Sequence, residues 1–200
     1  MKKLTVITVM IAGIAFTAFN NPIGTQITFT VDAGKSLFTW TGKKVTGEHT
    51  GNVNVSTGKI YINKGLLTGG EIEMDMNSIS ESEGNERLVG HLKSQDFFDV
   101  TNFPKSSFKA KLFSPVKDAK EGDANYTVKG DITIKGITKE IIFPATIKIT
   151  ENEITASADF NIDRTDFGIK FKSNKYDPGL GDKFIYDEFN IKINLVANAK

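Results

Sequence analysis

The sequence predicts an all-β protein, a single antiparallel barrel of about eight strands with a short helical insertion. Apolar residues recur at every second position in one segment after another, which is the pattern of strands with one dry face. This period changes between residues 78 and 99, where the helical insertion is expected. The 200 residues, 39% of them hydrophobic, suffice for one domain with a sizeable core. A closed barrel fits so many strands because closure removes exposed sheet edges.

Short alternating segments mark the strands of the first half of the chain. In residues 71–76, for example, three apolar residues alternate with three acidic ones, which gives a dry face and a wet face. The segments Asp32-Ala-Gly-Lys35 and Thr57-Gly58 are typical of turns. The strands expected in this half are residues 27–31, 38–40, 52–55, 60–62 and 71–76.

The helical insertion is expected between residues 78 and 99. Its candidate N-terminal caps are Ser80, Ser82 and Asn85, because a short polar side chain can accept a hydrogen bond from the first helical turn. Leu88 and Leu92 are four residues apart, so they share one helix face. We expect that face to point toward the barrel.

Strand patterning resumes after the insertion and continues through the second half. Residues 135–138 stand between two alternating segments and predict a tight hairpin turn. The strands expected here are residues 108–112, 128–134, 141–149, 154–162 and 189–197.

The interior of a barrel of this size either fills with its own side chains or holds one small ligand. Small residues occur among phenylalanines and isoleucines on the expected inner faces: Ala110, Gly130, Ala145, Ala156 and Ala158. They leave room for a ligand, but the ordinary taper of a barrel explains them equally well. Both interpretations stay open at the level of sequence.

Composition argues against several classes of function. With 25 basic and 24 acidic residues the chain has no strong field for a nucleic acid. The absence of cysteine excludes disulfides and thiolate chemistry, and two histidines with no recognisable catalytic motif leave most hydrolytic and metal chemistries without their parts. We therefore expect no enzyme activity, no cofactor and no metal. The 15 phenylalanines, against four tyrosines and one tryptophan, suit a core or an apolar cavity.

The first residues have the pattern of a secretory signal peptide. Lys2 and Lys3 precede an apolar run from Leu4 to Phe19, and polar residues follow at once. We expect a signal peptide in residues 1–19, cleavage between residues 17 and 21, and a single barrel domain in residues 20–200. This predicts a periplasmic or secreted protein.

One segment carries a recognisable signature. It places four phenylalanines around a helix end, a turn and a strand start, and begins His91-Leu-Lys-Ser-Gln-Asp-Phe-Phe-Asp-Val before reaching Phe103, Pro104 and Phe108. This pattern resembles the signature of the YceI-like family of periplasmic lipid-binding proteins. Residues 36–40, 131–139 and 160–169 resemble further segments of that family in the same order. The resemblance covers the chain from about Phe29 to Leu195.

The resemblance implies a lipocalin-like barrel that binds a long isoprenoid or another amphiphilic lipid in its interior. In the family an Arg-Asp pair is expected shortly before the His-Leu, whereas here Arg87 is followed by Leu88-Val89-Gly90. This chain lacks the aspartate of that pair, so the resemblance implies no head-group contact at this position. Transient contact with a membrane, and a monomeric or homodimeric state, are left open.

The residues expected to line the cavity are the large apolar ones on the inner faces: Phe38, Trp40, Val53, Val55, Ile72, Met74, Met76, Leu88, Phe97, Phe98, Phe108, Ile132, Ile141, Phe143, Phe160 and Phe167. At the mouth, His91 and Arg164 are candidates for contact with a polar head group. The alternatives are a local role of His91 at the helix end and an ion-pair network of Arg164 with Asp163 and Asp166.

These observations favour a non-catalytic protein that transports or stores a lipid. The alternative is a structural or stress-response interaction protein with a filled barrel and no ligand. The two readings differ in whether the inner rings surround a cavity or pack against one another.

Overall fold

The computed structural model describes residues 26–199. The expected signal peptide in residues 1–19 lies outside the described residues. The elements are β1 (Ile27–Val31), β2 (Leu37–Lys44), β3 (Gly47–Asn63), β4 (Leu66–Asp75), η1 (Met76–Ser78), α1 (Glu86–Lys93), β5 (Lys105–Pro115), β6 (Tyr126–Ile134), β7 (Ile137–Ile149), β8 (Glu153–Asp163), η2 (Arg164–Phe167), η3 (Pro178–Lys183) and β9 (Ile185–Ala199). Within residues 26–199, no helix has both the length and the apolar character needed to cross a membrane.

The strands form one closed antiparallel barrel, as predicted. Each of β3 to β8 pairs with the strand that follows it, and the ring closes because β1 and β2 both lie between β3 and β9. β1 pairs with one end of β3 and β2 with the other. The nine strands therefore occupy eight positions around the barrel.

One predicted turn is wrong. Thr57-Gly58 does not reverse the chain, because the expected strands 52–55 and 60–62 are parts of the single long strand β3. The pairing of β3 with β4 instead has an irregularity between Val55 and Thr57, which bends the strand. A side chain at Gly58 would lie 2.6 Å from a methyl group of Val31, so the glycine permits close packing against β1.

The other local predictions agree with the structure. Lys135 and Gly136 have φ values of 48° and 73° and form the tight turn between β6 and β7. The cap of α1 is Asn85, whose side chain accepts a hydrogen bond from the backbone N–H of Leu88 at 3.0 Å. Leu92 is buried and Leu88 is half-buried, so both face the protein as expected.

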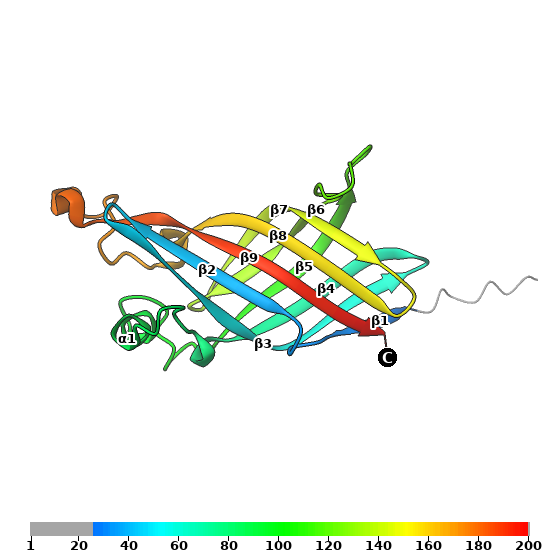
Figure 1. Cartoon of the computed structure of the whole chain (residues 1–200), viewed down its shortest axis with the longest axis horizontal. Coiled ribbons are helices and arrows are strands. Elements are labelled where there is room, and N and C mark those ends of the chain that lie inside the picture. The colour runs from blue at the N-terminus through cyan, green and yellow to red at the C-terminus, as the bar shows by residue number, and fades with distance from the viewer. Residues whose placement is uncertain (1–25, 200) are drawn as a thin grey trace, which may run out of the picture.

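The barrel has two different ends (Figure 1). At one end lie α1, η2 and η3, and at the other lie β1, the C-terminus and the hairpin between β3 and β4. The alternation of strand direction explains this arrangement, since successive connections fall at opposite ends. We call them the α1 end and the β1 end.

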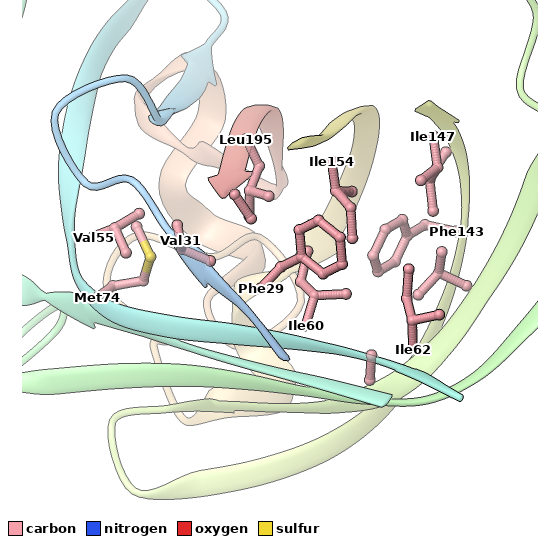
Figure 2. Close-up of a cluster of buried hydrophobic side chains, with 14 residues drawn as sticks. Phe29, Val31, Val55, Ile60, Ile62, Met74, Phe143, Ile147, Ile154 and Leu195 are labelled. Carbon is pink, nitrogen blue, oxygen red and sulfur yellow. The ribbon is translucent and has the colours of Figure 1, made fainter. Parts of the chain in front are cut away.

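Each end of the interior holds a cluster of buried side chains. The β1-end cluster contains Phe29, Val31, Val55, Ile60, Ile62, Met74, Ala110, Val128, Phe143, Ala145, Ile147, Ile154, Leu195 and Ala197. Figure 2 shows its larger members meeting inside the barrel. The α1-end cluster contains Ile79, Leu92, Phe97, Ile132, Ile134, Ile162, Phe167 and Ile169. The first fills the barrel interior beside β1, and the second joins the barrel to the helical insertion.

Candidate functional site

A cavity of about 110 Å³ lies inside the barrel between the two clusters. Its wall includes members of both, such as Met74 of the β1-end cluster and Ile79 of the α1-end cluster. The complete wall is Phe38, Thr39, Trp40, Val53, Ile72, Met74, Met76, Ile79, Phe98, Ser106, Ser107, Phe108, Ile132, Ile134, Ile141, Phe143, Phe160, Phe189, Ile191 and Ile193.

The position of an inward-facing residue along its strand decides whether it lines the cavity or belongs to the packed core. On β9, Phe189, Ile191 and Ile193 line the cavity, whereas Leu195 and Ala197 lie farther toward the β1 end and are buried in its cluster. The alternation places all five on one face. A single run of identical pattern therefore supplies both wall and core.

Three aromatic rings lie where the cavity wall meets the β1-end cluster: Phe143 belongs to both, and Phe108 and Phe160 of the wall pack against the cluster. The ring of Phe143 stacks on that of Phe160 at 4.2 Å between centroids and contacts Phe108 at 5.4 Å. Gly130 makes room for this arrangement, because a side chain there would lie 2.6 Å from the Phe108 ring. We call Phe108, Phe143 and Phe160 the ring shelf.

The polar groups at the wall are few, and those of Ser106, Thr39 and Trp40 have hydrogen-bond partners. Ser106 Oγ donates to the sulfur of Met76 at 3.1 Å, and Thr39 Oγ1 donates to Asn52 Oδ1 at 3.0 Å. Trp40 Nε1 donates to the backbone carbonyl of Ser80 at 3.1 Å. Within the described part of the chain, no charged side chain belongs to the wall. The cavity is therefore suited to an uncharged, apolar group.

Residues 78–85, from the last residue of η1 to the cap of α1, cover the side of the barrel next to Trp40. We call them the covering segment. Its Ser80 N–H donates to Asn52 O at 3.0 Å, and the hydroxyl of Ser78 accepts from the N–H of Asn54 at 2.8 Å. A side chain at Gly51 would lie 1.8 Å from the carbonyl oxygen of Ser80. Glycine at this position thus lets the segment lie directly on β3.

A buried carboxylate fixes the fold of the covering segment. Glu81 accepts hydrogen bonds from the N–H groups of Glu83 and Asn85 at 2.9 and 3.0 Å, and its other oxygen lies 3.2 Å from His49 Nδ1. The bond from Asn85 contributes most to holding the pKa of Glu81 below its ordinary value, while burial acts in the opposite direction. Ligand atoms of His49, Glu81 and Glu83 lie within 4.8 Å of one another, so within residues 26–199 these three side chains could hold a metal ion.

Arg164 is buried and fully hydrogen-bonded. Its guanidinium donates to four backbone carbonyls at 2.9 to 3.1 Å and to Asp187 Oδ1 at 3.1 Å. The carbonyls belong to Ile169, Phe171, Ile185 and Tyr186. Burial lowers the pKa of Arg164, but the charges of Asp187 and Asp163 oppose this effect. All five N–H groups are in use, so none is left for a head group.

His91 also has a local environment. Its Nε2 lies 3.1 Å from Asp96 Oδ2, and its ring meets the rings of Phe97 and Phe171 edge-on at 5.0 and 4.6 Å. It does not belong to the cavity wall. The structure thus places both predicted mouth residues in the packing of the α1 end.

Most of the predicted lining residues are brought together at the cavity. These are Phe38, Trp40, Val53, Ile72, Met74, Met76, Phe98, Phe108, Ile132, Ile141, Phe143 and Phe160. Four others lie outside the wall: Val55 belongs to the β1-end cluster, Phe97 and Phe167 to the α1-end cluster, and Leu88 packs against the latter. Ligand contact by any of these residues stays a prediction.

Several residues of the wall are not among those predicted from the sequence. They are Thr39, Ile79, Ser106, Ser107, Ile134, Phe189, Ile191 and Ile193. Phe189, Ile191 and Ile193 lie on one face of the predicted strand 189–197, so the alternation is a sufficient signal to include them. Ile79 has no such signal, because it lies on an irregular segment.

Known proteins share this architecture. Residues 29–197 match the family model of the YceI-like domain. The chain belongs to the YceI-like family. This YceI-like chain is 29% identical over 98 residues to a UPF0312 protein from Shewanella denitrificans, an alignment that covers 49% of this chain and 47% of that one. The match thus spans about half the length of such curated relatives.

Solved structures with the same fold have lower sequence identity. The crystal structure of BcnA from Burkholderia cenocepacia aligns with a TM-score of 0.67 and 21% identity, covering 83% of the YceI-like chain and 98% of BcnA. A polyisoprenoid binding domain from Saccharophagus degradans, implicated in plant cell wall breakdown, aligns with a TM-score of 0.65 and 12% identity, covering 87% and 99%. At these identities the likeness establishes the fold.

Proposed function

We propose that this YceI-like protein binds an isoprenoid or another amphiphilic lipid in its barrel, without catalysing a reaction, and transports or stores it outside the cytoplasm. The observation that carries the proposal is the apolar cavity, whose wall has no charged side chain among the described residues. The polyisoprenoid binding domain with the same fold supports a ligand of this class.

The physical driving force is sufficient without an ion pair. Each methylene group transferred from water to an apolar wall contributes about 0.8 kcal/mol. A chain of ten such groups would therefore gain roughly 8 kcal/mol before the cost of ordering it. A polar head would remain near water, because the wall has no charged side chain among the described residues and the hydroxyls of Thr39 and Ser106 and the indole of Trp40 are already hydrogen-bonded.

The proposed location rests on the sequence of residues 1–19. Two lysines followed by an apolar run are typical of an export signal. Mass spectrometry of the purified mature protein would give its first residue. An N-terminus between residues 17 and 21 supports export, whereas an intact Met1 in a cytoplasmic fraction contradicts it.

The binding proposal is tested on the full chain expressed with its leader. Solvent extraction of the purified protein followed by mass spectrometry should yield a lipid in stoichiometric amount, and an added isoprenoid alcohol should change the fluorescence of Trp40, the single tryptophan, which lines the cavity. A V53F variant, which fills the cavity, should lose both signals. A V116F variant at an exposed position should keep them.

The alternative, a ligand-free structural protein, is favoured by the small size of the cavity. Its volume of about 110 Å³ is below the range of roughly 300–1,000 Å³ that is common for small-molecule sites. It predicts that neither extraction nor titration detects a ligand and that V53F behaves like V116F. That combined result would eliminate the binding proposal.

A further inference from the structure

We infer that the ring shelf limits the length of chain that the cavity accepts, so that the ligand part held inside is a short uncharged chain of about a dozen carbon atoms. The inference rests on the proposed binding function and deepens it. It names Phe108, Phe143 and Phe160 as the residues that set specificity for chain length.

The shelf closes the cavity on the side of the β1 end. Phe143 is almost fully buried, and its two contacts with Phe160 and Phe108 span β5, β7 and β8. The room that the small inner residues provide is already used by protein atoms. Gly130 accommodates the Phe108 ring, while Ala110 and Ala145 are buried in the β1-end cluster.

Between the ring shelf and the β1 end, packed side chains of the β1-end cluster fill the barrel interior. The β1-end cluster includes Phe29, Ile154 and Ala197, which are 2%, 0% and 0% exposed. β1 supplies Phe29 and Val31, which fill the interior where β2 no longer runs. A chain could pass this point only by displacing packed core side chains, which costs more than the burial of a few methylenes gains.

The length of the cavity follows from its wall. On β9 the wall runs from Phe189 to Ile193, and along β4 it runs from Ile72 to Met76, the residue that directly follows the strand. Each run spans four residue steps, or about 14 Å along the strand at roughly 3.4 Å per residue. A fully extended chain covers about 3.3–3.6 Å per three bonds, so this length corresponds to about twelve bonds. A longer chain would have to leave the cavity at the α1 end, past Ile79 and Phe98.

A series of linear primary alcohols from about six to about eighteen carbons tests the limit, with Trp40 fluorescence as the readout. Affinity should rise about fourfold with each methylene until about twelve carbons and should then stop rising. A continued fourfold rise to the longest alcohol would overturn the inference while leaving the binding function intact. If no alcohol of any length binds, both the inference and the binding function fail.

Two matched variants locate the limit at the shelf. F160A removes a half-buried ring of the shelf, and we expect the break in the series to move by about three to four carbons toward longer alcohols. F189A removes a ring from the same wall near the α1 end, and we expect no such movement. Equal shifts in both variants, or a shift in F189A alone, would contradict the role of the shelf. The break in the unmodified protein provides a test that does not depend on the folding of either variant.

Discussion

Replacing Arg164 with methionine should cause a large loss of stability. The guanidinium donates five hydrogen bonds, four to backbone carbonyls and one to Asp187, from a side chain that is 4% exposed. R164M leaves these acceptors and a carboxylate without their partner, although methionine preserves much of the apolar contact. Together these bonds join the segment after β8 to the start of β9.

The size of the expected loss in unfolding free energy depends on how deeply each of the five hydrogen bonds is buried. Only the bond to the Ile169 carbonyl lies in fully buried surroundings, so the other acceptors can regain water when the guanidinium is removed. Breaking a buried ion pair from one side typically costs about 3–5 kcal/mol, and we expect R164M to fall in that range. This is a large share of the roughly 5–15 kcal/mol that stabilises a typical domain. The melting temperature should fall by about 10 °C or more.

Urea denaturation followed by Trp40 fluorescence and far-ultraviolet circular dichroism measures the effect. The control is K192M, since the ion pair of Lys192 with Asp159 is 3.4 Å long and both side chains are more than half exposed. It should change stability by less than about 1 kcal/mol. An R164K variant should not restore stability, because lysine has only three donors for five acceptors. A loss below about 1 kcal/mol in R164M, at an unchanged slope of the denaturation curve, would refute this account.

Three further predictions concern the covering segment and the core. G51A should displace the covering segment, because its new methyl group would lie 1.8 Å from the Ser80 carbonyl oxygen. A shift of the tryptophan emission would report the displacement. An unchanged emission spectrum together with an unchanged melting temperature would contradict this prediction. Because its pKa is lowered in the folded state, Glu81 should stabilise the segment fully above the ordinary glutamate pKa of about 4.3 and lose this contribution as the pH falls through the lower folded value. Acid titration of the fluorescence should therefore show a transition in the unmodified protein that E81Q lacks, and the same transition in both would show another group to be responsible. I154A, at a fully buried position, should lower the free energy of unfolding by about 2–5 kcal/mol in urea, and a smaller loss would indicate that the β1-end cluster can collapse around the change.

Much of the barrel was predictable because the alternation of apolar residues is a local property of the chain. The strands, the hairpin at Lys135–Gly136 and the cap at Asn85 each depend on residues that are close in sequence. The continuity of β3 was not predictable in this way, since Thr57-Gly58 has the composition of a turn. Only contact with Val31 of another strand shows why glycine is required there.

In the candidate site, too, local features were predictable from the sequence and long-range ones were not. Val53 and Val55 have the same side chain and the same face of β3, but one lines the cavity and the other is core, because they differ in position along the barrel. The sequence predicts contact of Arg164 with a head group, with an ion-pair network to its neighbours Asp163 and Asp166 as the alternative. The partner of Arg164 is Asp187, 23 residues away, because β9 returns past the end of β8. Positions along the axis and partners from distant strands are set by topology, which the alternation does not encode.

The position of β1 between β3 and β9 has a consequence for folding during synthesis. Phe29 pairs with Ala199, so a strand near the beginning of the chain needs a partner near its end. Until β9 has been made, β8 has an unpaired edge and β1 can pair only with β3. Such long-range pairing slows folding and leaves strand edges open to association with other chains. The growing chain is thus most prone to aggregate just before its last strand is complete.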